Sequence, residues 1–156
     1  MIRSSLFVSF ALLASVLLGQ VSSDSAQVVF DKIYTIESTD PKLAIKKYID
    51  LIPELNQELD KGRAYSYIGM VQLALGRYDS LDFYMDQALD IFEKEQYDRG
   101  LASVQNTLGN ADLYRGYYYL ALAHYQRALP YYEQEGQEYN LTVILNNMAA
   151  MFQHNE

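Results

Sequence analysis

Few side chains in this 156-residue chain could carry out chemistry, and their spacing does not bring them together. The two histidines, His124 and His154, have no fixed spacing to a carboxylate that would make either one a general base. Cysteine is absent, which excludes thiolate nucleophiles, Cys-ligated zinc and a disulfide-stapled fold. The acidic stretch 93–98 lacks the oxygen spacing and turn glycine of a calcium loop. We therefore expect no catalysis, no metal and no cofactor, with an enzyme that uses a helical cleft as a remote alternative.

Two asparagines are better candidates, for binding rather than for catalysis. Asn106 and Asn110 are four residues apart, so they are neighbours on one face if this segment is helical. An amide side chain offers both a donor and an acceptor to a peptide backbone. These residues can act together only if the surrounding elements present that face to a ligand.

The elements around them are repeated along the chain. Identical residues recur 40 positions apart (69 to 109), as in the pairs Gly69 and Gly109, Gly76 and Gly116, Tyr78 and Tyr118, and Ala88 and Ala128. A fixed period of this size indicates stacked supersecondary units. One further step of 40 from Gly109 reaches Ala149, so we expect a third unit that is truncated in its first helix.

Apolar residues recur at spacings of three and four, which predicts helices throughout, and no segment alternates as a strand would. Asp40 and Pro41 predict a helix start, and Pro53 should kink or split that helix before Lys61-Gly62 closes it. Gly76 and Gly116 predict helix ends. The expected helices cover residues 24–37, 41–61, 63–75, 79–96, 99–115, 117–135 and 139–152.

The charge of the chain limits its partners. Lys and Arg number 12 against 20 Asp and Glu, which gives a net charge of −8. Such a surface repels phosphate backbones and anionic lipids, so we expect no nucleic acid in this segment and no membrane contact beyond a leader.

The first residues have the pattern of a secretory signal peptide. Arg3 precedes an apolar run from Leu6 to Leu18 of about 13 residues, and small polar residues follow. A membrane-spanning helix needs roughly 20 residues, so an uncleaved anchor is the weaker alternative. We expect residues 1–23 to be a signal peptide and the protein to be exported, either to a periplasm or to the outside.

These residues together resemble the tetratricopeptide repeats. The second unit is similar to the family pattern almost position by position, from Asn106 to Ala111 and from Gly116 to Leu129, whereas the first unit has Leu81 and Met85 where the family has alanine and an aromatic residue. The family's period is about 34 residues. Here each unit has about six more, which we expect in the acidic connections 93–98 and 133–138. The longer period resembles repeats at the sensory ends of bacterial signalling proteins.

The resemblance implies an all-α, right-handed solenoid of helical hairpins, truncated in its last repeat. It divides the chain into a signal peptide (1–23), N-terminal helices that form a degenerate repeat (24–60), a first unit (61–98), a second unit (99–138) and the first helix of an incomplete third unit (139–156).

The resemblance also implies a concave face that receives extended peptides or partner helices, lined by the first helix of each pair. The matching positions are Arg63, Ser66, Met70 and Leu73, then Ser103, Asn106, Asn110 and Leu113, then Val143, Asn146 and Ala150. Asparagine is common at these positions in the family whether or not a peptide binds. A charged clamp for terminal carboxylates is not expected, because Arg63 is the one cation that these positions contain.

Tyrosine is abundant, with 15 residues, six of which are Tyr114, Tyr117, Tyr118, Tyr119, Tyr131 and Tyr132. Tyrosine suits protein interfaces, but it also packs between helices, and both interpretations are kept.

We therefore expect a non-catalytic scaffold that binds a protein or peptide, exported, and forming the sensory part of a larger signalling protein. The alternative is a structural assembly factor for envelope complexes. The uncovered last helix is expected either to meet a further repeat or to support self-association.

Overall fold

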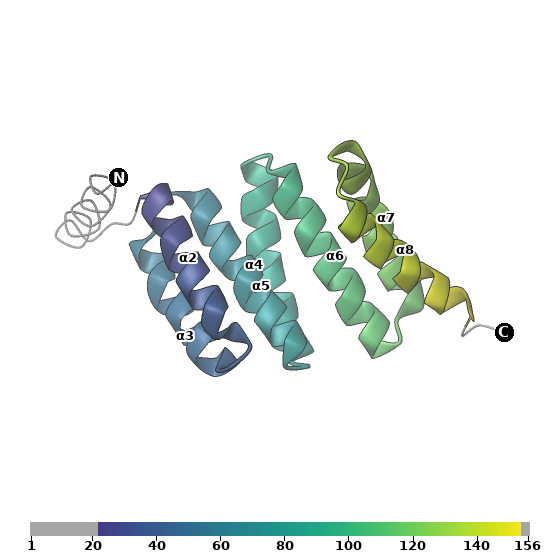
Figure 1. Ribbon diagram of the computed structural model, residues 1–156, viewed down its shortest axis with the longest axis horizontal. Helices are drawn as coiled ribbons and strands as arrows, with labels where there is room; N and C mark the ends of the chain where they lie inside the picture. The colour runs from purple at the N-terminus through teal and green to yellow at the C-terminus, as the bar shows by residue number, and fades with distance from the viewer. Residues whose placement is uncertain (1–21, 154–156) are drawn as a thin grey trace, which may run out of the picture.

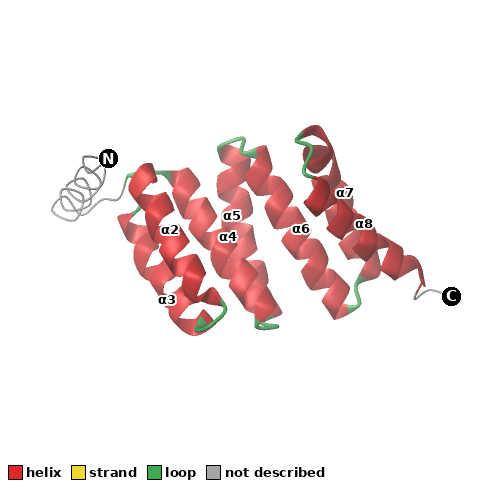
Figure 2. Cartoon of the chain, viewed as in Figure 1, coloured by secondary structure: helices red, strands yellow, loops and turns green. Residues whose placement is uncertain are grey.

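The computed structural model describes residues 22–153, and this part of the chain contains helices and no strand (Figure 2). The all-α expectation is therefore confirmed. His154 and all but the last two residues of the expected signal peptide lie outside the described residues. The elements are α2 (Ser23–Glu37), α3 (Pro41–Leu51), the 3-10 turn η1 (Ile52–Glu54), α4 (Glu58–Ala74), α5 (Tyr78–Lys94), α6 (Asp98–Arg115), α7 (Tyr118–Gln134) and α8 (Glu138–Gln153).

Consecutive helices pack against each other in the order of the chain (Figure 1). The hairpins α2/α3, α4/α5 and α6/α7 form a row, and α8 packs against α7 at the end of it. The helices α2, α4, α6 and α8 also contact one another in succession, whereas α3, α5 and α7 have no contacts of that extent among themselves. One side of the row, which we call the inner side, is therefore made by α2, α4, α6 and α8.

The helices from α4 onward begin at residues 58, 78, 98, 118 and 138, so each helix with its turn takes 20 residues (58 to 78, 78 to 98). Each turn contains a residue with positive φ, at Gly76 (66°), Gln96 (52°), Gly116 (80°) and Gly136 (61°). The residue after each of these donates its N–H to a carbonyl five positions back, for example Tyr117 to Asp112 at 2.8 Å. This is the left-handed helix stop expected at Gly76 and Gly116, and it occurs four times.

The two proline signals are confirmed. Pro41 begins α3, and the Asp40 side chain accepts a hydrogen bond of 3.0 Å from the N–H of Leu43. Before Pro53 the helix ends at Leu51, and the chain passes through η1 before α4 begins.

One expectation about a helix end was wrong. Lys61 and Gly62 do not close a helix, because α4 starts at Glu58 and runs through them. Gly62 instead allows α5 to approach closely, since a Cβ there would lie 2.7 Å from Cε1 of Phe92. In the acidic stretch 93–98, α5 continues to Lys94 and α6 begins at Asp98, so the connection between these helices is short.

The core runs along the row as three clusters of buried residues, the first in α2 to α4, the second in α5 and α6, and the third in α6 to α8. Leu81 and Met85, which depart from the family pattern, are fully buried, as are Ala121 and Tyr125 at the equivalent positions of the second unit. Met85 lies over Gly69 just as Tyr125 lies over Gly109. The substitution of one packing residue for another therefore leaves the arrangement of the helices unchanged.

Candidate functional site

A groove of about 320 Å³ opens on the inner side between α2, α4 and α6. It brings together four residues that the sequence assigns to the concave face, namely Arg63, Ser66, Met70 and Ser103. Their neighbours in the groove are Gln27, Tyr67, Phe92, Tyr97, Arg99 and Gly100. Hollows of similar size occur beside α3, beside α7 and beside η1, but they contain none of the predicted residues.

Arg63 is held in place from two sides of the groove. Its guanidinium donates to Oδ1 of Asp60 at 3.1 Å and to Oε1 of Gln27, and it lies 5.0 Å from the centre of the Phe30 ring. Burial acts to lower the pKa of Arg63, but hydrogen bonds and charges from Tyr67 and Asp60 outweigh burial and raise the pKa. Arg63 therefore stays charged and joins α2 to α4.

Arg99 is the second cation of the groove, and the sequence analysis missed it. It lies in the first turn of α6, its side chain is exposed, and it has no ion-pair partner among residues 22–153. The position 40 residues earlier is Leu59, so the repeat gave no signal. The available signal was its spacing of four from Ser103, which places both residues on one helix face.

Ser66 lies on the floor of the groove with only 5% of its surface exposed. No hydrogen bond that involves its hydroxyl occurs within the described residues, and the same is true of the Ser103 hydroxyl at the opposite wall. The groove therefore contains two hydroxyl groups, each able to donate and to accept a hydrogen bond, that the fold does not use.

Asn110 lies outside this groove, and the fold already uses its amide oxygen. That oxygen accepts hydrogen bonds from the hydroxyl of Tyr125 at 2.7 Å and from Nδ2 of Asn147 at 3.0 Å. Asn147 also donates to the Tyr125 oxygen at 3.1 Å. Burial raises the pKa of Tyr125 to about 12, so its hydroxyl remains a donor. These three residues connect α6, α7 and α8, and the sequence analysis did not single out Asn147.

The other predicted residues are divided between surface and core. The amide oxygen of Asn106 is buried and has no hydrogen-bond partner among the described residues. Leu113 is half-buried and packs against the third core cluster, and Asn146 is exposed on α8. None of these three residues lines the groove between α2, α4 and α6.

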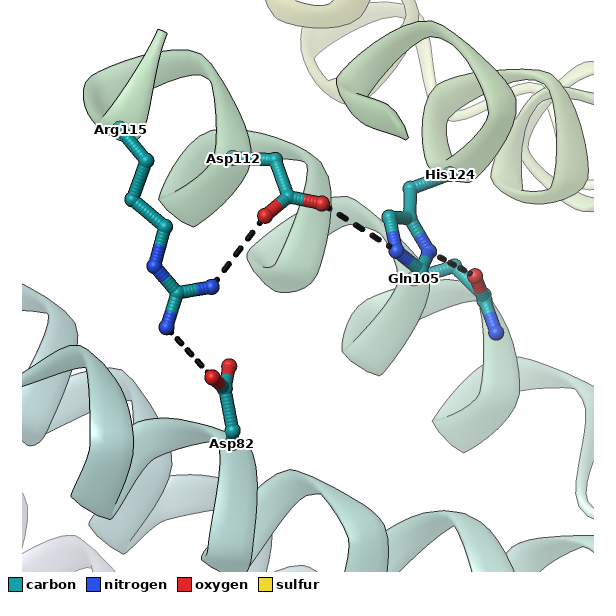
Figure 3. Close-up of polar contacts among 5 residues, drawn as sticks. All are labelled: Asp82, Gln105, Asp112, Arg115 and His124. Atoms are coloured by element: carbon teal, nitrogen blue, oxygen red, sulfur yellow. Dashed lines mark hydrogen bonds and ion pairs between the residues drawn. The ribbon is translucent and has the colours of Figure 1, made fainter. Parts of the chain in front are cut away.

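A polar network connects α5, α6 and α7 at another place (Figure 3). Arg115 bridges the carboxylates of Asp82 and Asp112, and Asp112 also lies 3.4 Å from Nε2 of His124. The Nδ1 atom of His124 makes a 2.7 Å hydrogen bond with Oε1 of Gln105. The spacing of residues in the sequence does not indicate this pair, because Asp112 comes from the helix that precedes the helix of His124.

The network has the properties of a structural contact. Burial lowers the pKa of His124, and the charge of Asp112 opposes this only in part. Both ring nitrogens face a neighbouring residue, Gln105 on one side and Asp112 on the other. Within residues 22–153, this network included, no group of three or more histidine or acidic side chains is arranged to hold a metal ion. None of the helices described is both long enough and apolar enough to cross a membrane.

The tyrosine cluster divides into two groups. Tyr125 and Tyr132 are buried between helices, and Tyr118 packs partly against the third core cluster. Tyr114, Tyr117 and Tyr119 are exposed by 70%, 56% and 89% around the turn between α6 and α7. Packing between helices is therefore confirmed for some members of this cluster, and the others are exposed.

Comparison of the chain with protein-family models, with curated proteins and with solved structures finds no match.

Proposed function

We propose that this protein is a non-catalytic scaffold of the tetratricopeptide type that binds a peptide segment of another protein in the groove between α2, α4 and α6. The resemblance of residues 106–129 to the family pattern supports this assignment, as does the row of hairpins with a common inner side. The signal-like residues 1–23 support export of the scaffold.

The observation that carries the proposal is the set of unused polar groups in the groove. Ser66 and Ser103 face a hollow of about 320 Å³ from two parallel helices, and Arg99 lies at its edge without a carboxylate partner among residues 22–153. An extended peptide presents N–H and C=O groups along its length, which such hydroxyls can satisfy. Arg63 is already paired with Asp60, so the charge of Arg99, unpaired within residues 22–153, is what favours a ligand segment with a carboxylate.

A random library of linear peptides, panned on the purified protein, tests the proposal. We expect the recovered peptides to contain Asp or Glu and to bind at least about tenfold more weakly to Arg99→Glu. Ser66→Leu should block binding by filling the floor of the groove.

Arg77→Glu is the matched control, because Arg77 is an exposed arginine that does not line the groove. It should change the affinity less than about twofold. Peptides that bind both groove variants as tightly as the parent protein, with circular dichroism showing all variants folded, would refute the assignment of this groove.

A further inference from the structure

A hollow of about 390 Å³ opens between α5, α6 and α7, and it shares no lining residue with the groove between α2, α4 and α6. We call it the α7 hollow. The residues that give it its chemistry come from all three helices, namely Glu93 of α5, Asp98 and Leu101 of α6, and Arg127, Pro130 and Tyr131 of α7.

The α7 hollow contains charges of both signs that do not pair with each other. Arg127 comes from one helix, and Glu93 and Asp98 come from the other two. Within residues 22–153, none of these three side chains has an ion-pair partner. Opposite charges that line one hollow without meeting leave room for a ligand that carries both.

The same hollow occurs one unit earlier, beside η1. All of the residues that line this η1 hollow, except Ile52, lie 40 positions before residues that line the α7 hollow, as Gln87 lies before Arg127 (87 to 127). Its volume, about 370 Å³, is also similar. The two hollows therefore occupy the same place in the repeat and can be compared residue by residue.

In the η1 hollow the fold already neutralises the charges. Lys61 pairs with Glu58 at 2.6 Å, and Asp90 pairs with Lys94 at 2.6 Å. These are all the charged residues that line the η1 hollow. Of the two equivalent hollows, the α7 hollow is thus the one whose charges lack partners in the described part of the chain.

Apolar groups line the α7 hollow together with the charges. Leu101 and Tyr131 are half-buried, and Pro130 lies beside Tyr131 in the lining. The ring of Tyr131 contacts the ring of the buried Tyr132 edge-on, with 5.7 Å between the ring centres. The contact holds the Tyr131 ring in place, so the hollow offers a positioned aromatic surface as well as charges.

We propose that the α7 hollow binds a small zwitterion with an apolar side chain, that is, a free amino acid or a short peptide. The ligand carboxylate pairs with Arg127, the ligand ammonium pairs with Asp98 and Glu93, and the side chain lies against Leu101 and Tyr131. A ligand with only one charge would bring that charge close to a like charge of the hollow, which is unfavourable. The volume of the hollow is that of a small-molecule site.

Isothermal titration calorimetry of the purified protein with leucine and with leucyl-leucine tests the proposal. We expect at least one of them to bind with a dissociation constant of about 1 mM or lower. Its N-acetylated and its C-terminally amidated forms, which each lack one charge, should bind at least about tenfold more weakly. Tighter binding of leucine would identify free amino acids as the ligands, and tighter binding of leucyl-leucine would identify short peptides. Binding of neither compound, or equal binding of the modified forms, overturns the proposal.

Substitutions locate the bound compound. Arg127→Gln introduces the residue that the η1 hollow has at this position, and it should weaken binding at least about tenfold, as should Asp98→Asn. Lys61→Gln is the matched control in the η1 hollow and should change the affinity less than about twofold. With all variants folded by circular dichroism, unchanged affinity in both α7-hollow variants, or an equal loss in Lys61→Gln, overturns the proposal.

The variant Arg99→Glu separates this site from the groove of the proposed function. Arg99 lines that groove and not the α7 hollow, so its substitution should leave the affinity for the zwitterion within about twofold. Loss of binding in Arg99→Glu with unchanged binding in Arg127→Gln would place the compound in the groove. The inference about the α7 hollow would then fail, and the proposed function would stand.

Discussion

The ring of Tyr125 occupies the space that a side chain at position 109 would need. A Cβ atom at Gly109 would lie 2.6 Å from Cε1 and 2.7 Å from Cδ1 of that ring, and Tyr125 is fully buried. At the equivalent place in the first unit, a Cβ at Gly69 would lie 2.6 Å from the terminal methyl of Met85. The two contacts are geometrically equivalent, but a rigid ring meets one glycine and a flexible side chain meets the other.

Alanine at these two positions should therefore have different effects. We expect Gly109→Ala to lower the free energy of unfolding by about 1–3 kcal/mol, because the buried ring cannot move away. In Gly69→Ala the end of Met85 can shift, and alanine favours the helix by about 1 kcal/mol over glycine, so the net change should be small. Urea unfolding with an unchanged m-value measures both. Equal losses in the two variants would show that the flexibility of the neighbour does not matter.

The two asparagines that stand out in the sequence should also differ. Asn110→Ala removes the acceptor of the Tyr125 hydroxyl, so we expect a loss of about 1–3 kcal/mol in the free energy of unfolding. Asn106→Ala removes a buried oxygen that has no hydrogen-bond partner among the described residues, so it should not destabilise the protein measurably.

A double-mutant cycle of Asn110→Ala with Tyr125→Phe tests the assignment to that hydrogen bond. The coupling free energy should exceed about 0.5 kcal/mol. Additive effects in the cycle, or a large loss in Asn106→Ala, would contradict these roles.

Gln96 stands at a turn position where three other turns have glycine. Its φ of 52° lies in the left-handed region, which costs an L-residue roughly 1–2 kcal/mol. Gln96→Gly should raise the free energy of unfolding by about 0.5–1 kcal/mol, since the flexibility that glycine adds to the unfolded chain offsets part of the gain. The matched control is Glu95→Gly, one residue earlier, where φ is −83° and glycine should destabilise. A loss of stability in Gln96→Gly would mean that its side chain makes a contact worth more than the backbone strain.

The stability of the protein should fall as the pH falls below about 7, with His124 as one cause. Burial lowers the pKa of His124 in the folded protein, and the groups around it are Asp112, Asp82, Gln105 and Arg127. The unfolded chain, with an ordinary value near 6.5, then binds more protons than the folded one just below that pH. The contribution is present above about pH 6.5 and is lost as the pH falls through the folded pKa.

Proton NMR of the imidazole in a His154→Ala background should give a titration midpoint below 6.5 for His124. The fall in unfolding free energy between pH 7.5 and pH 5 should be smaller in His124→Gln than in the parent protein. A midpoint above 6.5 would show that the charge of Asp112 prevails over burial, in spite of its neutralisation by Arg115.

The helices could be predicted from the sequence because their ends are determined by residues close to them in the chain. Asp40, Pro41, Gly76 and Gly116 each act on the backbone beside them, and the structure agrees with each. The prediction at Gly62 was wrong because the sequence does not distinguish a glycine that ends a helix from a glycine that allows two helices to approach closely. The ring of Phe92, which distinguishes the two cases, is 30 positions away (62 to 92).

The inner-face residues could be predicted only where they lie on the same helix, because their spacing in the sequence shows which of them share a face of that helix. Arg63, Ser66 and Met70 share a face of α4, and the structure places them in one groove. The use of Asn110 by Tyr125 depends on how α7 packs against α6, which no spacing within α6 can show. Arg99 could not be predicted from the repeat, because its counterpart Leu59 is apolar.

Because the turns recur at 20-residue intervals, only certain changes of chain length keep the later helices in register with their neighbours. An α-helix rotates by about 100° per residue, so deleting one residue within α5 would swing every later helix away from its neighbours. Inserting one further helix with its turn, 20 residues in all, would place α6 on the side of the row that α3, α5 and α7 occupy. The surface that α6 presents to the inner side would then face the other way. Duplication of a whole 40-residue hairpin keeps every helix on its own side of the row and in contact with equivalent neighbours. It is therefore the change of length by which such a row of helices can be extended without altering its packing.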